Sequence, residues 1–243
     1  MHILNKVIFF ILVVGSFQSF SIYNYQSFVG NFEEIYSETN FVSDQVLVID
    51  SICNHSDNQW NYSCVKNTIK KINSMKAYLY KRGYSYVQNP QIDFTLLAIL
   101  EAEKRYTVDH KLILAVAITE SGLNPRAISI VGARGLLQVM PATATGIWND
   151  FLVTLPLNDS LRAKAYPCVN SLYKIRLSVL LGTFYLDRLL KRFNYNPIYA
   201  LASYNVGPTK VSRSIKRNPY RAPANLLLGQ SYYQKILNIH KAI

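Results

Sequence analysis

A single glutamate, Glu120, lies where an apolar stretch of predicted helix ends. It follows Val116 and Ala117 by about one helical turn, so its side chain projects from the same helical face as theirs. Burial disfavours a charged carboxylate, and the carbonyl-rich end of a helix does the same, so we expect the pKa of Glu120 to be raised. A carboxyl that stays protonated near neutral pH can donate its proton to a leaving oxygen.

The sequence around Glu120 offers no second carboxylate. There is no Asp or Glu between Glu120 and Asp150, whereas ordinary glycosidases place two carboxyl groups about 5 to 9.5 Å apart. Folding can still bring Asp150 or Asp187 near Glu120. For a lone glutamate the alternative is an ordinary surface residue at a helix end, so the neighbouring motifs decide between the two interpretations.

Three motifs follow one another in the order and spacing of a known family. The first is ESGLNP at 120–125, continued by Ser129 and by GARGLLQVMPATA at 132–144. The second is ALASYNVGP at 200–208, and the third is YYQKI at 232–236. Together they resemble the soluble lytic transglycosylase family over about residues 94–237. Residues 22–90 lie outside the resemblance.

The resemblance implies a lysozyme-like α-helical fold and a reaction that needs one acid. In such a reaction Glu120 first protonates the bond between N-acetylmuramic acid and N-acetylglucosamine. The substrate's own 2-acetamido group then stabilises the anomeric centre. The same glutamate, now a base, helps the muramyl C6 hydroxyl to attack, which leaves a 1,6-anhydro end. One carboxyl therefore serves twice, and the missing partner is explained.

The resemblance also implies substrate-binding residues, namely Ser129, Gln138, Met140, Tyr204 and Asn205. Hydroxyl and amide groups can bind the polar edges of a sugar, and a thioether can pack on its apolar face. Ser129 is expected near Glu120 and the acetamido group, and Tyr204 is expected to hydrogen-bond the catalytic carboxyl. Simple core packing is the alternative role for Met140 and Tyr204.

Four further residues are expected to support the site: Ser121, Gly132, Gly135 and Tyr232. Ser121 fits helix-end hydrogen bonding better than a nucleophilic role, because no histidine lies near it in the sequence. The two glycines permit a tight backbone. The chain departs from the family pattern at Ser203 and Val206, where alanines are usual. It also lacks an acidic residue in 219–231, which puts a secondary cleft contact in doubt.

Hydrophobic periodicity predicts helices throughout and few strands. Helical stretches are expected around 65–80, from Asp93 to Arg105, from an N-cap at Asp109 to Ser121, from Pro141 onward, and over 172–193 and 198–204. The predicted fold class is therefore all-α, with a lysozyme-like catalytic domain over residues 91–243. A mostly helical extension of unknown role over residues 22–90 precedes it.

The first residues predict export. Lys6 precedes an apolar run at 7–14, which small residues follow, and this is the layout of a secretory signal peptide over residues 1–21. The run is shorter than the roughly 20 residues that span a bilayer, so no permanent membrane span is expected after cleavage. We expect a periplasmic or exported protein, and an uncleaved anchor is the alternative.

The three cysteines suggest one disulfide in an exported protein, and Cys53 with Cys64 is the pair closest in sequence. Cys168 would then be free, and three reduced, buried thiols are the alternative. The chain lacks Cys-x-x-Cys and cysteine–histidine clusters with metal-ligand spacing, so we expect neither a metal site nor a cofactor.

Charge is concentrated in the second part of the chain. Residues 91–243 hold nineteen Lys or Arg against eight Asp or Glu, whereas residues 22–90 hold six of each. A basic exported domain suits an anionic polymer or surface, and a solvated basic surface is the alternative. The expected partners are peptidoglycan glycan strands, with envelope or secretion-system proteins as further candidates. Nucleic acid is not expected, because no nucleic-acid-binding motif is present.

Two other functions remain open from the sequence. A hydrolase of the goose-type lysozyme kind would share the fold but deliver water to the substrate. An inactive glycan-binding scaffold of an envelope-spanning machine would share the fold without any chemistry.

Overall fold

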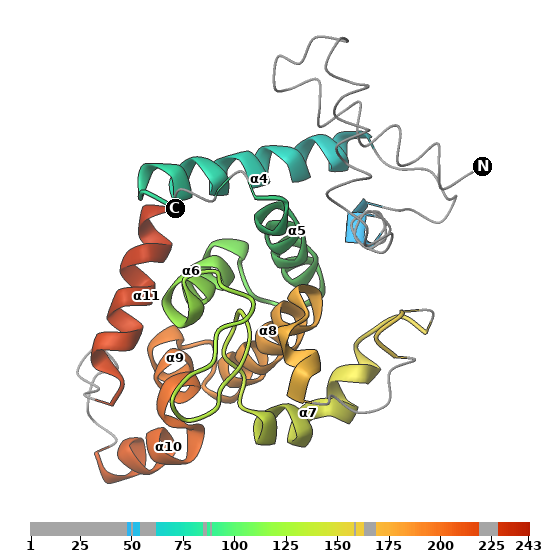
Figure 1. Ribbon diagram of the computed structural model, residues 1–243. Helices are drawn as coiled ribbons and strands as arrows, with labels where there is room; N and C mark the ends of the chain where they lie inside the picture. The colour runs from blue at the N-terminus through green and yellow to red at the C-terminus, as the bar shows by residue number, and fades with distance from the viewer. Residues whose placement is uncertain are drawn as a thin grey trace, which may run out of the picture. The chain divides into compact units, whose positions relative to one another are not determined.

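The computed structural model describes residues 48–49, 51–53, 62–84, 87, 89–157, 159–162, 169–218 and 228–243 (Figure 1). The chain forms two compact units, residues 1–73 and 74–243. In the described residues the named elements are all helices, and the β-structure consists of isolated bridges within 128–139. The predicted all-α fold class is confirmed.

The described part of the first unit is small. It comprises short helical pieces at 48–49 and 51–53 and the first residues of helix α4 (Tyr62–Lys81). A disulfide joins Cys53 to Cys64 across a Cα–Cα distance of 5.5 Å. The Thr68 hydroxyl lies 3.5 Å from the Cys53 sulfur, where it can donate a hydrogen bond. The predicted signal peptide and Cys168 lie outside the described residues.

Helices α5 (Pro90–Arg105) and α6 (His110–Ser121) form one corner of the second unit. α5 begins before the predicted start at Asp93, because Asn89 caps it and proline is tolerated in the first turn of a helix. α6 begins where its sequence predicts, with Asp109 as N-cap. It ends at Gly122, whose φ of 59° is the left-handed conformation that glycine adopts readily.

Helix α8 (Ile175–Arg192) lies in the interior and is largely buried. It packs against α5 and against α9 (Pro197–Val206), and the short 3₁₀-helix η3 (Val169–Tyr173) and α7 (Pro141–Val153) also contact it. α7 starts at Pro141, as predicted. α10 (Pro208–Arg217) follows α9 after Gly207. In the described ranges, no helix is long and apolar enough to span a membrane.

Helix α11 (Gln230–Ala242) packs along α6 (Figure 1). Tyr232, near its start, contacts Glu120 at the end of α6, and His240, near its end, contacts Asp109 at the start of α6. The two helices therefore run in opposite directions. Tyr233 and Ile236 of α11 are buried, and they anchor the helix to the core.

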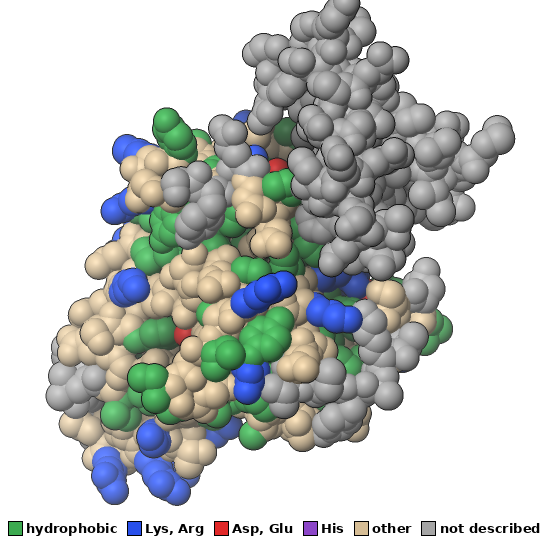
Figure 2. All heavy atoms as spheres, in the orientation of Figure 1, with side chains coloured by type: hydrophobic (Ala, Val, Ile, Leu, Met, Phe, Trp, Pro, Cys, Tyr) green, Lys and Arg blue, Asp and Glu red, His purple; other side chains and the backbone are tan. Residues whose placement is uncertain are grey.

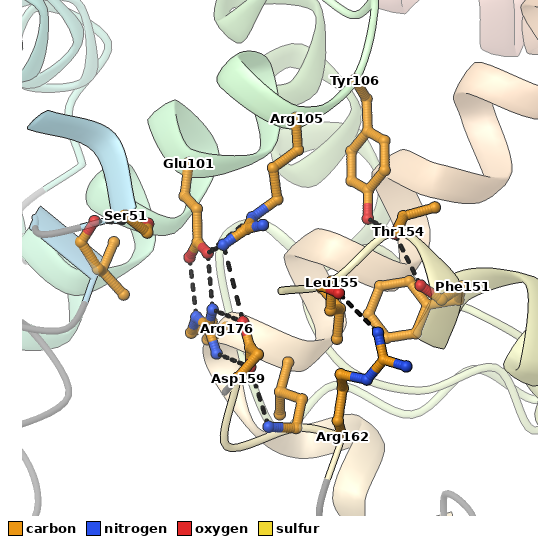
Figure 3. Close-up of polar contacts among 12 residues, drawn as sticks. Ser51, Glu101, Arg105, Tyr106, Phe151, Thr154, Leu155, Asp159, Arg162 and Arg176 are labelled. Atoms are coloured by element: carbon orange, nitrogen blue, oxygen red, sulfur yellow. Dashed lines mark hydrogen bonds and ion pairs between the residues drawn. The ribbon is translucent and has the colours of Figure 1, made fainter. Parts of the chain in front are cut away.

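A buried charged network, made of Glu101, Arg105, Asp159 and Arg176, connects α5 to the start of α8 (Figure 3). Arg176 donates to Glu101 at 2.7 and 2.8 Å and to Asp159 at 2.6 and 2.9 Å. Arg105 donates to Glu101 from the following turn of α5. Two guanidinium groups thus face two carboxylates, so each buried negative charge has a positive partner.

Candidate active site

Glu120 lies in the last turn of α6 and is partly buried. The Tyr232 hydroxyl donates a hydrogen bond to Glu120 Oε1 at 2.6 Å. Burial raises the pKa of Glu120, and the Tyr232 hydrogen bond and the positive charge of Lys235 oppose the rise without cancelling it. The raised pKa is the one expected from the apolar face of its helix. The side chain is therefore equipped to hold a proton.

Two tyrosine side chains, Tyr232 and Tyr204, interact with this carboxyl. Burial, together with the charge of Glu120, raises the pKa values of Tyr232 and Tyr204 well above 10. The ring of Tyr204 packs against Tyr185, with centroids 5.4 Å apart. Both phenols close to Glu120 therefore remain protonated near neutral pH, and each keeps a hydrogen to donate.

The structure gives Tyr204 a different partner from the one expected. Its hydroxyl donates to the carbonyl oxygen of Leu137 at 2.7 Å, and the hydrogen bond expected between Tyr204 and Glu120 is made by Tyr232. The reason is the packing of α11 along α6, which brings the Tyr232 hydroxyl to the carboxyl. Tyr204 instead connects α9 to the loop that follows α6.

Ser129 lies in a tight turn of this loop, which we define as residues 122–140. Its hydroxyl accepts a hydrogen bond from the backbone N–H of Ala133 at 2.9 Å, and its own N–H donates to the Ala133 carbonyl at 3.0 Å. Gly132 closes the turn with a φ of 89°. Ser129 thus shapes the turn, and its hydroxyl hydrogen is left for another acceptor.

Gln138 and Gly135 hold the other end of the loop. The Gln138 amide nitrogen donates to the carbonyls of Ala127 at 3.0 Å and Gly135 at 2.8 Å, so the amide oxygen is the group that can accept a further hydrogen bond. Gly135 has a φ of 76°, and a Cβ at this position would overlap the backbone carbonyl of Leu172. A glycine is therefore required here.

The remaining predicted residues lie at helix ends. The Ser121 hydroxyl is 3.0 Å from the Ala117 carbonyl and 2.9 Å from the Leu136 carbonyl, which gives it the helix-end role expected for it. Met140 is 37% exposed immediately before α7, so its thioether is accessible from solvent. Asn205 is exposed near the end of α9.

The two aspartates that folding might have brought to Glu120 have other partners. Asp150 pairs with Arg188 on α8. Asp187 accepts hydrogen bonds from Lys191 at 2.6 Å and from the backbone N–H of Thr107 at 3.3 Å. Each aspartate is therefore committed to a cation, and in the described part of the chain the hydrogen-bond partner of Glu120 is a tyrosine.

Sequence reasoning did not assign Lys235 and Tyr185 to the site. Lys235 lies one helical turn after Tyr232 in the YYQKI motif, and this spacing places both residues on one face of α11. That spacing was a usable signal for Lys235. Tyr185 had no such signal, because it reaches the site through the packing of α8 against α9.

Comparisons with known proteins indicate the family and the fold of the chain. A family model described as Transglycosylase SLT domain matches residues 98–227. The soluble lytic murein transglycosylase of Escherichia coli (strain K12) is 34% identical over 119 residues, which are 47% of this chain and 17% of that protein. The chain therefore matches about a sixth of the length of that relative.

Two solved structures show the same fold. The 70-kDa soluble lytic transglycosylase from Escherichia coli gives a TM-score of 0.51 at 20% identity, covering 83% of this chain and 32% of that chain. An inactive mutant of the lytic transglycosylase Slt from Pseudomonas aeruginosa gives a TM-score of 0.50 at 22% identity, covering 82% of this chain and 29% of that chain.

Proposed function

Because the chain belongs to the Transglycosylase SLT domain family, we propose that it is a peptidoglycan lytic transglycosylase with Glu120 as its catalytic residue. It cleaves the β-1,4 bond between N-acetylmuramic acid and N-acetylglucosamine without water and leaves 1,6-anhydro ends. The observation that carries the proposal is the Glu120 carboxyl itself. It is partly buried, its pKa is raised, and its hydrogen-bond partner is a neutral phenol.

The hydrogen bond from Tyr232 determines where the proton of Glu120 resides. A protonated carboxyl has one oxygen that accepts and one that carries hydrogen. Because Tyr232 donates to Oε1, we assign the catalytic proton to Oε2. In the first step this proton moves to the glycosidic oxygen while the bond from that oxygen to the anomeric carbon breaks.

The second step uses the carboxylate that the first step creates. The Tyr232 hydrogen bond and the Lys235 charge both stabilise this ionised form. The muramyl C6 oxygen then bonds to the anomeric carbon, and its proton returns to Glu120. The acid is regenerated, so a second carboxylate and a water molecule are both unnecessary.

The charge distribution supports an anionic polymer as the target. Figure 2 shows basic side chains gathered where α10 lies, and the exposed basic residues of this helix are Lys210, Arg213, Lys216 and Arg217. No acidic residue follows Asp187 in the sequence. We propose that the enzyme acts on glycan strands in the periplasm or outside the cell, after export by the segment at 1–21.

Digestion of purified peptidoglycan, analysed by mass spectrometry, tests the proposed function. The wild-type protein is expected to release products with 1,6-anhydro ends, and Glu120→Gln is expected to release them at least about 100-fold more slowly. Asp150→Asn is the matched control, because it removes a carboxylate that pairs with Arg188, and it should keep the activity. Reducing ends would identify a hydrolase instead, and a wild-type protein without products would identify a binding scaffold.

A further inference from the structure

The pair of helices α6 and α11 is joined at both ends, and only one end takes part in the proposed reaction. At the other end lie four side chains that the reaction leaves unused: Glu103, Asp109, His110 and His240. They come from the end of α5, the start of α6 and the end of α11. Two imidazoles and two carboxylates therefore converge at one corner of the second unit.

The distances in this cluster are short. The His110 Nδ1 atom lies 2.6 Å from Glu103 Oε1 and 3.1 Å from Asp109 Oδ1, so one ring nitrogen faces two carboxylates. Ligand atoms of these three residues all lie within 4.8 Å of one another. The second oxygen of Asp109 lies 2.7 Å from His240 Nε2. Asp109 thus connects the two histidines.

We propose that Glu103, Asp109 and His110 bind a divalent first-row transition-metal ion of the Zn²⁺ type, and that His240 orients Asp109. One imidazole nitrogen and two carboxylate oxygens form a ligand set that Zn²⁺ accepts, with a water completing the coordination. Ligand atoms at Zn²⁺ bond lengths of about 2.1 Å are about 3.4 Å apart in a tetrahedral site. The His110 Nδ1 atom is 2.6 Å from Glu103 and 3.1 Å from Asp109, so metal binding requires these side chains to move apart.

The metal takes the place of the hydrogen that His110 and Glu103 share. A hydrogen bond now joins the Nδ1 atom of His110 to the carboxylate oxygen of Glu103. When the metal binds, both atoms become its ligands. His240 is left to donate to Asp109 Oδ2, and such a hydrogen bond fixes the orientation of a ligating carboxylate.

Charge and access both permit a cation at this corner. The start of α6 contributes about half a positive charge, which two carboxylates outweigh. The side chains of Glu103 and Asp109 are 25% and 44% exposed, so an ion can enter from solvent. A bound ion would fasten the α5–α6 corner to the end of α11, the helix that carries Tyr232 to Glu120.

The sequence analysis predicted no metal site, because the chain lacks Cys-x-x-Cys and cysteine–histidine clusters with metal-ligand spacing. The cluster uses carboxylates instead of thiolates, and His240 is 131 residues away from Asp109. The three ligands come from the end of α5 and the start of α6, and the packing of α11 is needed only to bring His240 to Asp109.

Titration calorimetry with Zn²⁺ tests the proposal on the full chain, purified without a histidine tag and first treated with a chelator. One Zn²⁺ per chain is expected, and the Tm should rise with the Zn²⁺ concentration. Mg²⁺ should not compete, because it prefers oxygen ligands alone. The variants Glu103→Gln and His110→Gln should each lower the Zn²⁺ affinity by at least about tenfold, and His240→Gln by about 10 to 100-fold.

Asp109→Asn keeps an N-cap side chain on α6 while removing the ligating charge, so it separates metal binding from helix capping. It should retain the metal-free Tm and lose the increase with Zn²⁺. Asp150→Asn is the control, because it removes a carboxylate that pairs with Arg188 outside the cluster. This variant should bind Zn²⁺ like the wild type. The proposal is overturned if the wild type binds no Zn²⁺, or if a Glu103→Gln/His110→Gln double variant binds it equally well.

Discussion

Glu101 and Glu120 lie on adjacent helices of the same core, yet their surroundings are opposite. Glu101 is 1% exposed and accepts hydrogen bonds from two arginines, Arg105 and Arg176 (Figure 3). Glu120 is partly buried, and among the described residues its carboxyl accepts one hydrogen bond, from the neutral Tyr232. The charge of Glu101 is compensated by two guanidinium groups, whereas the Glu120 carboxyl is hydrogen-bonded to a neutral phenol.

The comparison shows how burial can serve either structure or chemistry. Burial alone would raise the pKa of Asp159 in the Glu101 network, but hydrogen bonds from Arg176 hold that pKa below its ordinary value. At Glu120 burial is the larger effect, and the pKa is raised. A carboxylate paired with guanidinium groups keeps its charge and connects helices, whereas one without a cation in contact can hold and release a proton.

Replacing Glu120 should separate activity from stability most clearly. Glu120→Gln keeps the acceptor for Tyr232 but cannot transfer a proton, so the rate of product formation should fall by about 10²- to 10⁴-fold or more. The free energy of unfolding, measured with urea, should not fall, because no paired charge is lost. A variant that is inactive because it has unfolded would contradict the assignment.

Breaking the Glu101 network should lower stability, whereas Glu120→Gln should lower activity. Arg176→Met leaves Glu101 and Asp159 short of a buried partner, and we expect a loss of about 3–5 kcal/mol in the free energy of unfolding. Arg188→Met is the matched control, because it breaks the exposed pair with Asp150 and should cost less than about 1 kcal/mol. Equal losses in the two variants would show that the network does not stabilise the core.

Removing the Tyr232 hydroxyl should shift the pH dependence of catalysis. The first step needs protonated Glu120, so kcat/KM should fall as the pH rises through the pKa of this residue. The Tyr232 hydrogen bond lowers that pKa, so in Tyr232→Phe the fall should occur at higher pH. Tyr199→Phe, which removes a tyrosine hydroxyl from α9, is the control and should leave the pH profile unchanged. A profile that does not move in Tyr232→Phe would refute the coupling.

The smallest effect should be a difference in how stability depends on pH. The pKa of Glu120 is raised from 4.5 on folding, so its ionisation destabilises the folded chain, increasingly as the pH rises from 4.5 through the raised value. The advantage of Glu120→Gln over wild type in urea should grow across that window. The Asp159 pKa is lowered from 3.8, so its stabilisation should disappear as the pH falls below 3.8 through the folded value.

Local sequence predicted the elements that position the acid. Asp109 and Pro141 begin their helices where capping and proline preferences place them, because those preferences depend on neighbouring backbone groups alone. The prediction that α5 starts at Asp93 was wrong, because Asn89 caps the helix and α5 begins at Pro90. The raised pKa of Glu120 was also predictable, because its helical face is apolar over successive turns.

The sequence by itself therefore determined the all-α class, the helix that carries Glu120 and the motifs of its family. Only the tertiary structure decided which side chains meet. Tyr232 reaches Glu120 across 112 residues, and Arg176 reaches Glu101 across 75. Those contacts depend on how α11 packs on α6 and α8 on α5, because hydrogen bonds form over a few ångströms while sequence patterns describe only neighbours along the chain.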